Sequence, residues 1–222
     1  TKDEMEGIPH YLIDEFDPKD EFSVAIFQEK AKKYLEIIYS KNKIPILVGG
    51  TGFYIQALVY DINFMEINND YEYRSYLENL SKEKGNQYIH DMLSKVDPVS
   101  ASKIHPNNIK RIIRALEYYK LTNKPISQHN EEEKKNKFSP YNTAFFCLNM
   151  NREILYKRID TRVDQMIKLG LVEEVNDLLK KGYSPNLVSM QGLGYKEIVK
   201  YLQGKISLDE AIYILKRDTR HF

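Results

Sequence analysis

The chain has 222 residues, of which 42% are hydrophobic and 29% are charged, and its formal net charge is +1. This length predicts a single domain, or a core that carries one inserted subdomain. No apolar run approaches the roughly 18 residues of a membrane-spanning helix, and the charged first residues do not resemble a signal peptide. The balanced charge gives no support for a nucleic-acid binder, although a local basic face would be sufficient for one.

Two absences limit the chemistry further. The single cysteine, Cys147, excludes an internal disulfide and a multi-cysteine metal site, and it agrees with a reducing cytoplasm. Because Cys147 lies in an apolar run, we expect it in the core. The sequence also lacks a G-x-x-x-x-G-K-[ST] phosphate loop, since Gly204-Lys205 is followed by Ile206.

The first 60 residues predict alternating strands and helices. A short strand is expected at residues 10–13, and Ser23 can cap a helix whose apolar side chains recur at helical spacing. The unbroken apolar run 44–48 is typical of a strand buried on both faces, and a glycine-rich turn and a helix follow it. This order of elements predicts a parallel, doubly wound sheet.

Helices dominate the middle of the chain, from about residue 61 to residue 139. Asp70, Asp97 and Asn108 can each cap one of them, and the charged run 131–137 predicts a mobile loop. After this region the elements of the core return. A strand is expected at residues 141–148, and helices at 152–169, at 171–181 and after the capping box that begins at Ser207.

The run Gly49-Gly50-Thr51-Gly52 is the first candidate site. After a buried strand, such a turn presents free backbone amides and the positive end of a helix to a phosphate or diphosphate, and the Thr51 hydroxyl can add a hydrogen bond. The alternative is a tight turn that needs glycine for its backbone conformation alone. The sequence does not decide between the two.

A basic ridge on the helix that follows Asn108 is the second candidate. Lys110, Arg111 and Arg114 are three and four residues apart, so they share one side of the helix and could grip RNA phosphates. The alternative is an ordinary solvated face. The apolar stripe of the same helix consists of Ile109, Ile112, Ile113 and Leu116.

Two further groups could bind the substrates. Arg152, Arg158 and Arg162 lie on one predicted helix and suit bidentate contacts with diphosphate, unless they pair with the carboxylates of that helix. In the run Gln191-Gly192-Leu193-Gly194-Tyr195-Lys196, the tyrosine could stack on a base and the lysine could meet a phosphate. A helix cap with a packed tyrosine is the alternative for this run.

Several short stretches, taken in order, resemble the tRNA dimethylallyltransferase family, also called tRNA isopentenyltransferases. Each stretch is weak alone, but the ordered set runs from one end of the chain to the other and is specific. The matching stretches are Gly7-Ile8-Pro9-His10-Tyr11-Leu12-Ile13-Asp14 with Asp17-Pro18, Pro45 to Gly52, His105-Pro106-Asn107 with Arg111 to Glu117, Arg158-Ile159 with Arg162 to Met166, Gly170 to Val175, and Gly192 to Glu197.

The resemblance implies a fold and a reaction. The family has a P-loop NTPase-like parallel-sheet core with a helical insertion, which agrees with an α/β core at 1–60 and 140–222 interrupted by helices at 61–139. It transfers a dimethylallyl group from dimethylallyl diphosphate to the exocyclic N6 amine of the adenosine 3′ of the anticodon. The cofactor and partners implied are Mg²⁺, the tRNA anticodon stem-loop and the diphosphate donor, and we expect a cytoplasmic monomer without membrane contact.

The resemblance also assigns roles to residues. It implies that Thr51 and Arg74 approach the target nucleotide or its neighbours, and that Arg158 or Arg162 lies near the diphosphate. The tRNA contacts implied are Lys110, Arg111, Ile112, Ile113, Arg114, Gln191, Gly192, Leu193, Gly194, Tyr195 and Lys196. The diphosphate turn, Gly49, Gly50 and Gly52, is expected from the glycine run itself.

Parts of the family pattern fall outside these residues. The phosphate loop and the Asp-Ser stretch, whose aspartate serves as general base, would precede Thr1, and the Arg-Gln…Trp-Phe tail would follow Phe222. Two other functions remain open from the sequence. One is a small P-loop kinase or NTPase, which needs a phosphate loop and a pocket for a nucleotide base, and the other is an RNA-binding module without catalysis.

Overall fold

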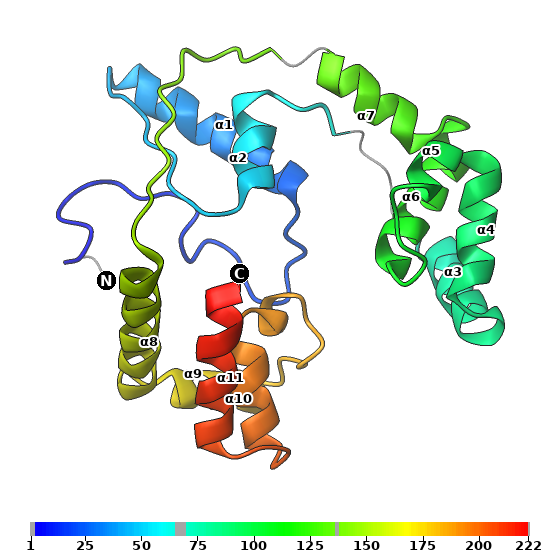
Figure 1. Ribbon diagram of the computed structural model, residues 1–222. Helices are drawn as coiled ribbons and strands as arrows, with labels where there is room; N and C mark the ends of the chain where they lie inside the picture. Colours follow the sequence, from blue (N-terminus) through cyan, green and yellow to red (C-terminus); the bar gives the residue numbers. More distant parts are fainter. Residues whose placement is uncertain (1–2, 65–69, 136–137, 222) are drawn as a thin grey trace. The chain divides into compact units, whose positions relative to one another are not determined.

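The computed structural model describes residues 3–64, 70–135 and 138–221, and the regular secondary structure within these ranges is helical (Figure 1). The chain divides into two compact units. Unit 1 consists of Thr1–Ser23 and Ala144–Phe222, and unit 2 is Val24–Thr143. No helix in the described ranges is long and apolar enough to cross a membrane.

Unit 2 begins with a pair of packed helices, α1 (Val24–Ser40) and α2 (Gly52–Val59). The buried side-chain amide of Gln28 joins them, since its Nε2 donates to the carbonyl oxygens of Ala57 at 2.7 Å and Ile62 at 2.9 Å. A buried amide needs such partners, because an unmade hydrogen bond in the core costs about 1–3 kcal/mol. Gln28 therefore fixes where the chain leaves α2.

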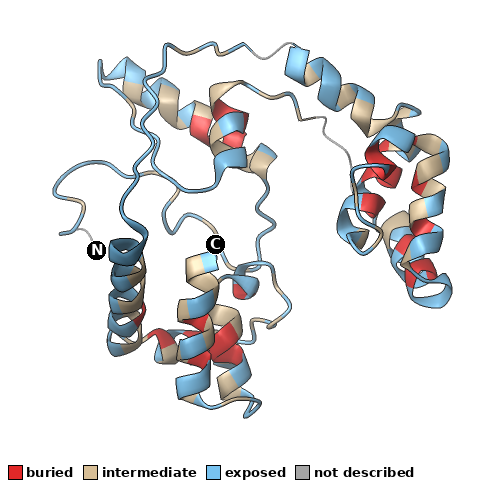
Figure 2. Cartoon of the chain, in the orientation of Figure 1, coloured by how far each residue is buried: buried red, intermediate tan, exposed pale blue. Residues whose placement is uncertain are grey.

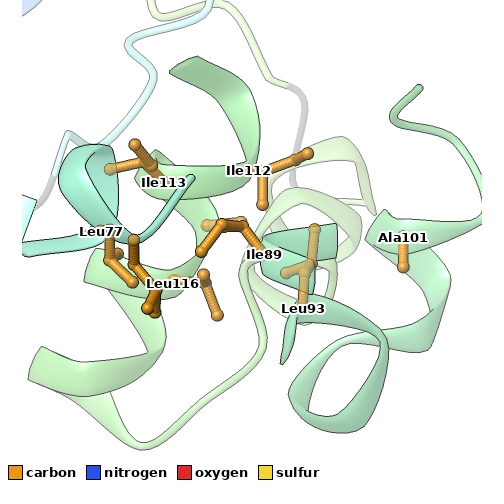
Figure 3. Packing of buried hydrophobic residues seen from close by; sticks show 9 residues of the cluster. Leu77, Ile89, Leu93, Ala101, Ile112, Ile113 and Leu116 are labelled. Carbon is orange, nitrogen blue, oxygen red and sulfur yellow. The ribbon is translucent and has the colours of Figure 1, made fainter. Parts of the chain in front are cut away.

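The rest of unit 2 is a cluster of helices around its own apolar core (Figures 2 and 3). The helices are α3 (Tyr71–Lys84), α4 (Asn86–Val96), α5 (Pro98–Ala101), α6 (Ile109–Thr122) and α7 (Ile126–Lys135). The buried core consists of Leu77, Leu80, Ile89, Leu93, Ala101, Ile112, Ile113, Ala115 and Leu116. The predicted apolar stripe of α6 supplies three of these side chains, so the helical spacing in the sequence identified the buried face correctly.

Capping by a short polar side chain explains several of the helix starts. Asp70 accepts from the Tyr73 amide at 2.9 Å, Asp97 accepts from the Ser100 amide at 2.9 Å, and Ser207 Oγ accepts from the Glu210 amide at 3.2 Å. These predicted caps are confirmed. Asn108 also precedes its helix, but its side chain accepts no hydrogen bond from the first turn, so the predicted capping by Asn108 is wrong.

Unit 1 contains α8 (Arg152–Lys168), α9 (Leu171–Lys180), the short 3-10 helix η1 (Ser189–Gln191), α10 (Tyr195–Leu202) and α11 (Leu208–His221). Their common core consists of Val163, Leu171, Val175, Met190, Ile198, Val199, Ala211 and Leu215. The N-terminal segment is bonded to η1 and to the loop before it, because Ser189 Oγ donates to the Pro18 carbonyl at 2.8 Å and Tyr183 Oη donates to Asp17 Oδ2 at 2.9 Å.

The predicted parallel sheet is wrong for this structure. Residues 10–13, 44–48 and 141–148 form no strand, and no residue in the described ranges does so. A strand exists only when its backbone N–H and C=O groups bond to a neighbouring strand. Apolar runs indicate that a segment can be buried, but they do not supply that neighbour. Ile46 is accordingly 84% exposed and Phe146 also 84% exposed.

Two smaller expectations also fail. Residues 131–135 belong to α7 and do not form a loop, while residues 136–137 of the same predicted loop lie outside the described residues. The His129 ring of α7 stacks on Tyr118 of α6 at 5.6 Å between ring centroids, a tertiary contact that charge patterning cannot reveal. Cys147 is exposed rather than in the core, because the apolar run that contains it has no partner layer.

The predicted division into a core (1–60 and 140–222) and an insertion (61–139) remains a prediction. Within unit 2, α1 and α2 pack on each other, while α3 to α7 surround a separate core. That separation is the observation which supports treating the second group as the inserted part.

Candidate functional site

The basic ridge on α6 is exposed and has no acidic partner in the described residues. Packing of the apolar stripe turns the opposite side of the helix outward, and Lys110, Arg111 and Arg114 are all exposed there. No ion pair forms between them and any carboxylate in the ranges that the structure describes. The ridge therefore presents three uncompensated cations to a partner.

Arg74, in contrast, is engaged within the cluster. Its Nε and Nη2 donate to Glu117 Oε1 at 2.8 Å and Oε2 at 2.9 Å, which joins α3 to α6 by a bidentate ion pair. The Glu117 side chain is 3% exposed and that of Arg74 is 38% exposed. The hydrogen bonds that Arg74 donates to Glu117 are the main cause that raises the pKa of Arg74. The predicted nucleotide contact of Arg74 would have to use its exposed edge.

Glu117 is a residue that sequence reasoning missed. It follows Ile113 by four positions, so helical spacing places it on the buried face of α6. A carboxylate on a buried face requires a cation or several hydrogen-bond donors, so the sequence could have predicted that Glu117 has a partner of this kind. A second pair lies beside it: Lys120 Nζ is 2.8 Å from Asp70 Oδ2 and 4.1 Å from the centre of the Tyr73 ring. Together the two pairs hold the start of α3 against α6.

The glycine turn leads directly into α2, with Thr51 at the N-cap. Its side chain makes no capping hydrogen bond, so the hydroxyl is not used by the helix. None of Gly49, Gly50 and Gly52 has a positive φ, and a Cβ atom on any of them would meet nothing within 4 Å. The backbone of this turn therefore does not require glycine. The alternative, in which the glycines are present only to form a tight turn, loses its support.

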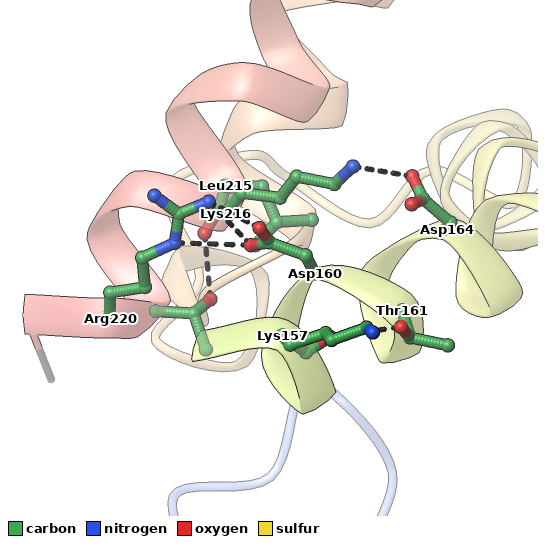
Figure 4. A network of polar contacts seen from close by, with 8 residues as sticks. Lys157, Asp160, Thr161, Asp164, Leu215, Lys216 and Arg220 are labelled. Carbon is green, nitrogen blue, oxygen red and sulfur yellow. Dashed lines mark hydrogen bonds and ion pairs between the residues drawn. The ribbon is translucent and has the colours of Figure 1, made fainter. Parts of the chain in front are cut away.

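Two carboxylates of α8, Asp160 and Asp164, form ion pairs with α11 (Figure 4). Arg220 Nη2 donates to Asp160 Oδ1 at 2.6 Å, and Lys216 Nζ lies 2.6 Å from Asp164 Oδ1. The alternative in which these aspartates neutralise the α8 arginines is therefore wrong. Arg158 and Arg162 remain exposed without an ion pair in the described ranges.

The free face of α8 forms a shallow depression of about 460 Å³. It is lined by Ile154, Lys157, Arg158, Thr161, Arg162 and Gln165. These positions repeat at intervals of three and four residues, so one side of a single helix collects two guanidinium groups, an ammonium group and two neutral polar side chains. Arg152 lies apart from this set, with its guanidinium over the Tyr156 ring at 5.9 Å. The face could hold an anion.

The predicted tRNA-contacting run 191–196 forms the entry to α10. Gly194 has φ +101°, a backbone conformation that favours glycine, whereas a Cβ atom there would meet Leu171 Cδ2 at an ordinary contact distance of 3.7 Å. Tyr195 Oη donates a short hydrogen bond to Glu174, and burial, followed by this bond, raises the pKa of Tyr195 to about 12. Tyr195 is half-buried, so only part of its ring is accessible to a base.

The described residues hold no group of three or more His, Cys, Asp or Glu side chains that could ligate a metal ion. Of the predicted site residues, the glycine turn, Arg74 and the α6 ridge belong to unit 2. Arg158, Arg162 and the run 191–196 belong to unit 1, where α8 and α10 share one core.

The sequence profile of the IPP transferase family matches residues 1–222. This chain belongs to the IPP transferase family. The resemblance seen in the short sequence stretches is thereby confirmed, as is the expectation of a prenyl-transferring enzyme. The kinase or NTPase and the non-catalytic RNA-binding module are not favoured.

Similar proteins of the IPP transferase family agree along the whole chain. It is 59% identical to the tRNA dimethylallyltransferase of Lachnoclostridium phytofermentans over 222 residues, which cover 71% of that protein. It is 53% identical to the enzyme of the same name from Acetivibrio thermocellus, of which it covers 70%.

Solved structures of IPP transferases are also similar. The full-length tRNA isopentenylpyrophosphate transferase of Bacillus halodurans is 44% identical, with a TM-score of 0.66, 100% of this chain covered and 68% of that one. A eukaryotic dimethylallyltransferase acting on tRNA is 30% identical, with a TM-score of 0.81. The match covers 99% of this chain and 55% of that one.

Proposed function

We propose that this IPP transferase moves the dimethylallyl group of dimethylallyl diphosphate to the N6 amine of the adenosine 3′ of the anticodon in tRNA. Its family and the names of its relatives support the reaction. The observation within the fold that carries the proposal is a pair of exposed basic faces, one on α6 and one on α8, that have no acidic partner among the described residues. Both substrates are polyanions.

The α6 ridge is proposed to hold the tRNA backbone. Lys110, Arg111 and Arg114 lie on one exposed side of a helix whose other side is fixed in a core, so their positions are set while their head groups are hydrated. Contacts of this kind bind phosphates of any sequence and position the RNA without reading its bases. The buried Ile112 and Ile113, expected as tRNA contacts, would act by supporting the helix.

The α8 face is proposed to hold the diphosphate, with Arg158 and Arg162 as its main cations. Guanidinium groups match phosphate oxygens with two parallel hydrogen bonds. When the allylic carbon–oxygen bond breaks, negative charge grows on the departing diphosphate, and cations placed there stabilise the transition state more than the ground state. The ion pairs of Asp160 and Asp164 with α11 serve this role, because they keep the two carboxylates away from the anion.

The glycine turn is proposed to approach the reacting centre with Thr51 and the first amides of α2. The Tyr54 amide bonds to the Thr51 carbonyl at 3.0 Å, whereas the amides of Gly52 and Phe53 precede the helical hydrogen-bond ladder. Two such amides and a hydroxyl can donate to an anionic oxygen. Open space around the glycines, with nothing within 4 Å of a Cβ position, would allow a ligand to come close to the backbone.

The acceptor base must leave its stack to meet the donor, and a carboxylate must take the proton of the amine. A divalent metal accompanies this class of transfer, and we propose Mg²⁺. Among the described residues, no three His, Cys, Asp or Glu side chains gather to ligate it. We also propose a cytoplasmic monomer, in agreement with the cysteine content and the tRNA substrate.

Transfer of labelled dimethylallyl from its diphosphate to the N6 position of tRNA tests the reaction, and the α6 ridge tests the binding surface. In the complete protein, Arg111→Gln and Arg114→Gln together should lower the slope of log Kd against log salt by about 1.5, since each lost phosphate contact removes about 0.7–0.9. Lys82→Gln with Lys95→Gln removes the same charge from exposed positions on α3 and α4 and should leave the slope unchanged. Equal effects of the two pairs would reject the ridge as a specific surface.

A further inference from the structure

A groove beside α10 carries three lysines, two of which have no role in the assignments above. It is lined by Lys196, Lys200 and Lys205 and by the side-chain amides of Asn186, Gln191 and Gln203. Its volume is about 390 Å³. We propose that this lysine groove binds phosphates of the tRNA backbone, with Lys200 and Lys205 as contacts additional to the predicted Lys196. The inference rests on the proposed tRNA substrate.

The fold brings the three lysines together by local geometry. Lys196 and Lys200 are four residues apart on α10 and so lie on one side of it. The helix then ends in a reversal at Gly204, whose φ of +69° suits glycine. The Lys205 amide donates to the Lys200 carbonyl at 3.0 Å and the Gly204 amide to the Tyr201 carbonyl at 2.8 Å, the two bonds of a Schellman motif. This reversal returns Lys205 to the side of Lys200.

The acidic groups near the groove are already engaged. Glu197 lies 3.5 Å from Lys196, but it is 1% exposed and its other oxygen accepts from the Gly194 amide at 2.9 Å. Asp218 is within electrostatic range of Lys196 and pairs with Arg217 at 2.8 Å. Lys200 and Lys205 are exposed and form no ion pair in the described part of the chain. The surface of the groove is therefore positively charged.

The lining chemistry favours a polyanion over a peptide or an apolar ligand. Ammonium groups and amide N–H groups both donate to phosphate oxygens, and the groove offers three of each kind of side chain. Its rim is held in place, because Gln191 Nε2 donates to the Pro185 carbonyl at 2.6 Å. The groove is also continuous with the run 191–196, so an RNA strand that meets Gln191 and Lys196 would reach Lys200 and Lys205 next.

The test uses the complete protein and measures tRNA affinity across salt concentrations. Lys200→Gln with Lys205→Gln should lower the slope of log Kd against log salt by about 1.5, whereas Lys200→Arg with Lys205→Arg should preserve it. Lys168→Gln with Lys181→Gln is the matched control, because it removes two exposed lysines of unit 1 that lie outside the groove. The KM for dimethylallyl diphosphate should stay the same in all variants.

Each alternative result has its own meaning. An unchanged slope in the glutamine pair, or an equal decrease in the control pair, overturns the groove as a tRNA site. A raised KM for dimethylallyl diphosphate with an unchanged slope also overturns it, and assigns the groove to the free diphosphate. If the wild type modifies tRNA while the groove variants bind normally, the inference fails and the proposed function stands. A wild type that transfers nothing to tRNA refutes the function instead.

Discussion

Replacement of Arg74 by alanine should destabilise the cluster of helices α3 to α7 more than replacement of its partner Glu117 by glutamine. The substitution leaves the Glu117 carboxylate, whose side chain is 3% exposed, without its two donors at 2.8 and 2.9 Å. Breaking a fully buried pair costs about 3–5 kcal/mol, and because Arg74 is 38% exposed, water weakens the pair and we expect about 3 kcal/mol. Glu117→Gln leaves a cation that already reaches water, so its cost should be about 1–2 kcal/mol.

The double variant distinguishes the cost of an unpaired buried carboxylate from the cost of the lost Arg74 contacts. Arg74→Ala combined with Glu117→Gln should be more stable than Arg74→Ala alone, because no buried carboxylate remains ionised without a partner. Lys120→Ala is the control, since it breaks the more exposed pair with Asp70 and should therefore cost less than Glu117→Gln.

Native-state hydrogen exchange at the amides of α3 and α6 measures the opening free energy of this cluster in the complete protein. A loss below about 1 kcal/mol in Arg74→Ala, or a double variant less stable than Arg74→Ala, would refute the reasoning. The same variants address the predicted nucleotide contact. A decrease in tRNA affinity for Arg74→Ala that Glu117→Gln does not share would assign that contact to the exposed edge of Arg74.

Three further predictions concern other sites. Burial raises the pKa of Asp97, but hydrogen bonds from Ser127 and Ser100 outweigh it and hold the pKa below its ordinary value. The ionised Asp97 therefore stabilises the fold above about pH 4, and this contribution is lost as the pH falls through the folded pKa. Asp97→Asn should lower the free energy of unfolding by about 2–4 kcal/mol at pH 7. In urea unfolding, the variant should also lose most of the decrease in stability that the wild type shows in acid. Thr51→Ala should lower kcat by about 100-fold or more with little change in tRNA Kd, and a changed Kd with normal kcat would contradict its role. Arg158→Gln with Arg162→Gln should lower kcat/KM for the diphosphate donor by at least about 100-fold. Replacement of Arg217, an exposed arginine of α11, by glutamine should leave kcat/KM unchanged. Equal losses in the two variants would reject the α8 face as the diphosphate site.

The sequence alone determined the features that depend on a few neighbouring residues. The caps at Asp70, Asp97 and Ser207 were predictable because a short polar side chain bonds to an amide two or three positions later, within the same turn. The buried stripe of α6 and the exposed ridge opposite it followed from helical spacing. The ordered stretches that identified the family likewise required no knowledge of contacts.

Only the tertiary structure decided how charges and apolar segments find partners across the chain. Whether Asp160 neutralises Arg158 or pairs with Arg220 depends on a contact between residues 60 positions apart. The pairing of the buried Glu117 with Arg74 has the same origin, because packing brings α3 and α6 together over 43 positions of sequence. The strand predicted at 44–48 failed for the same reason. A strand requires hydrogen bonds between two segments, and one apolar run specifies only one of them.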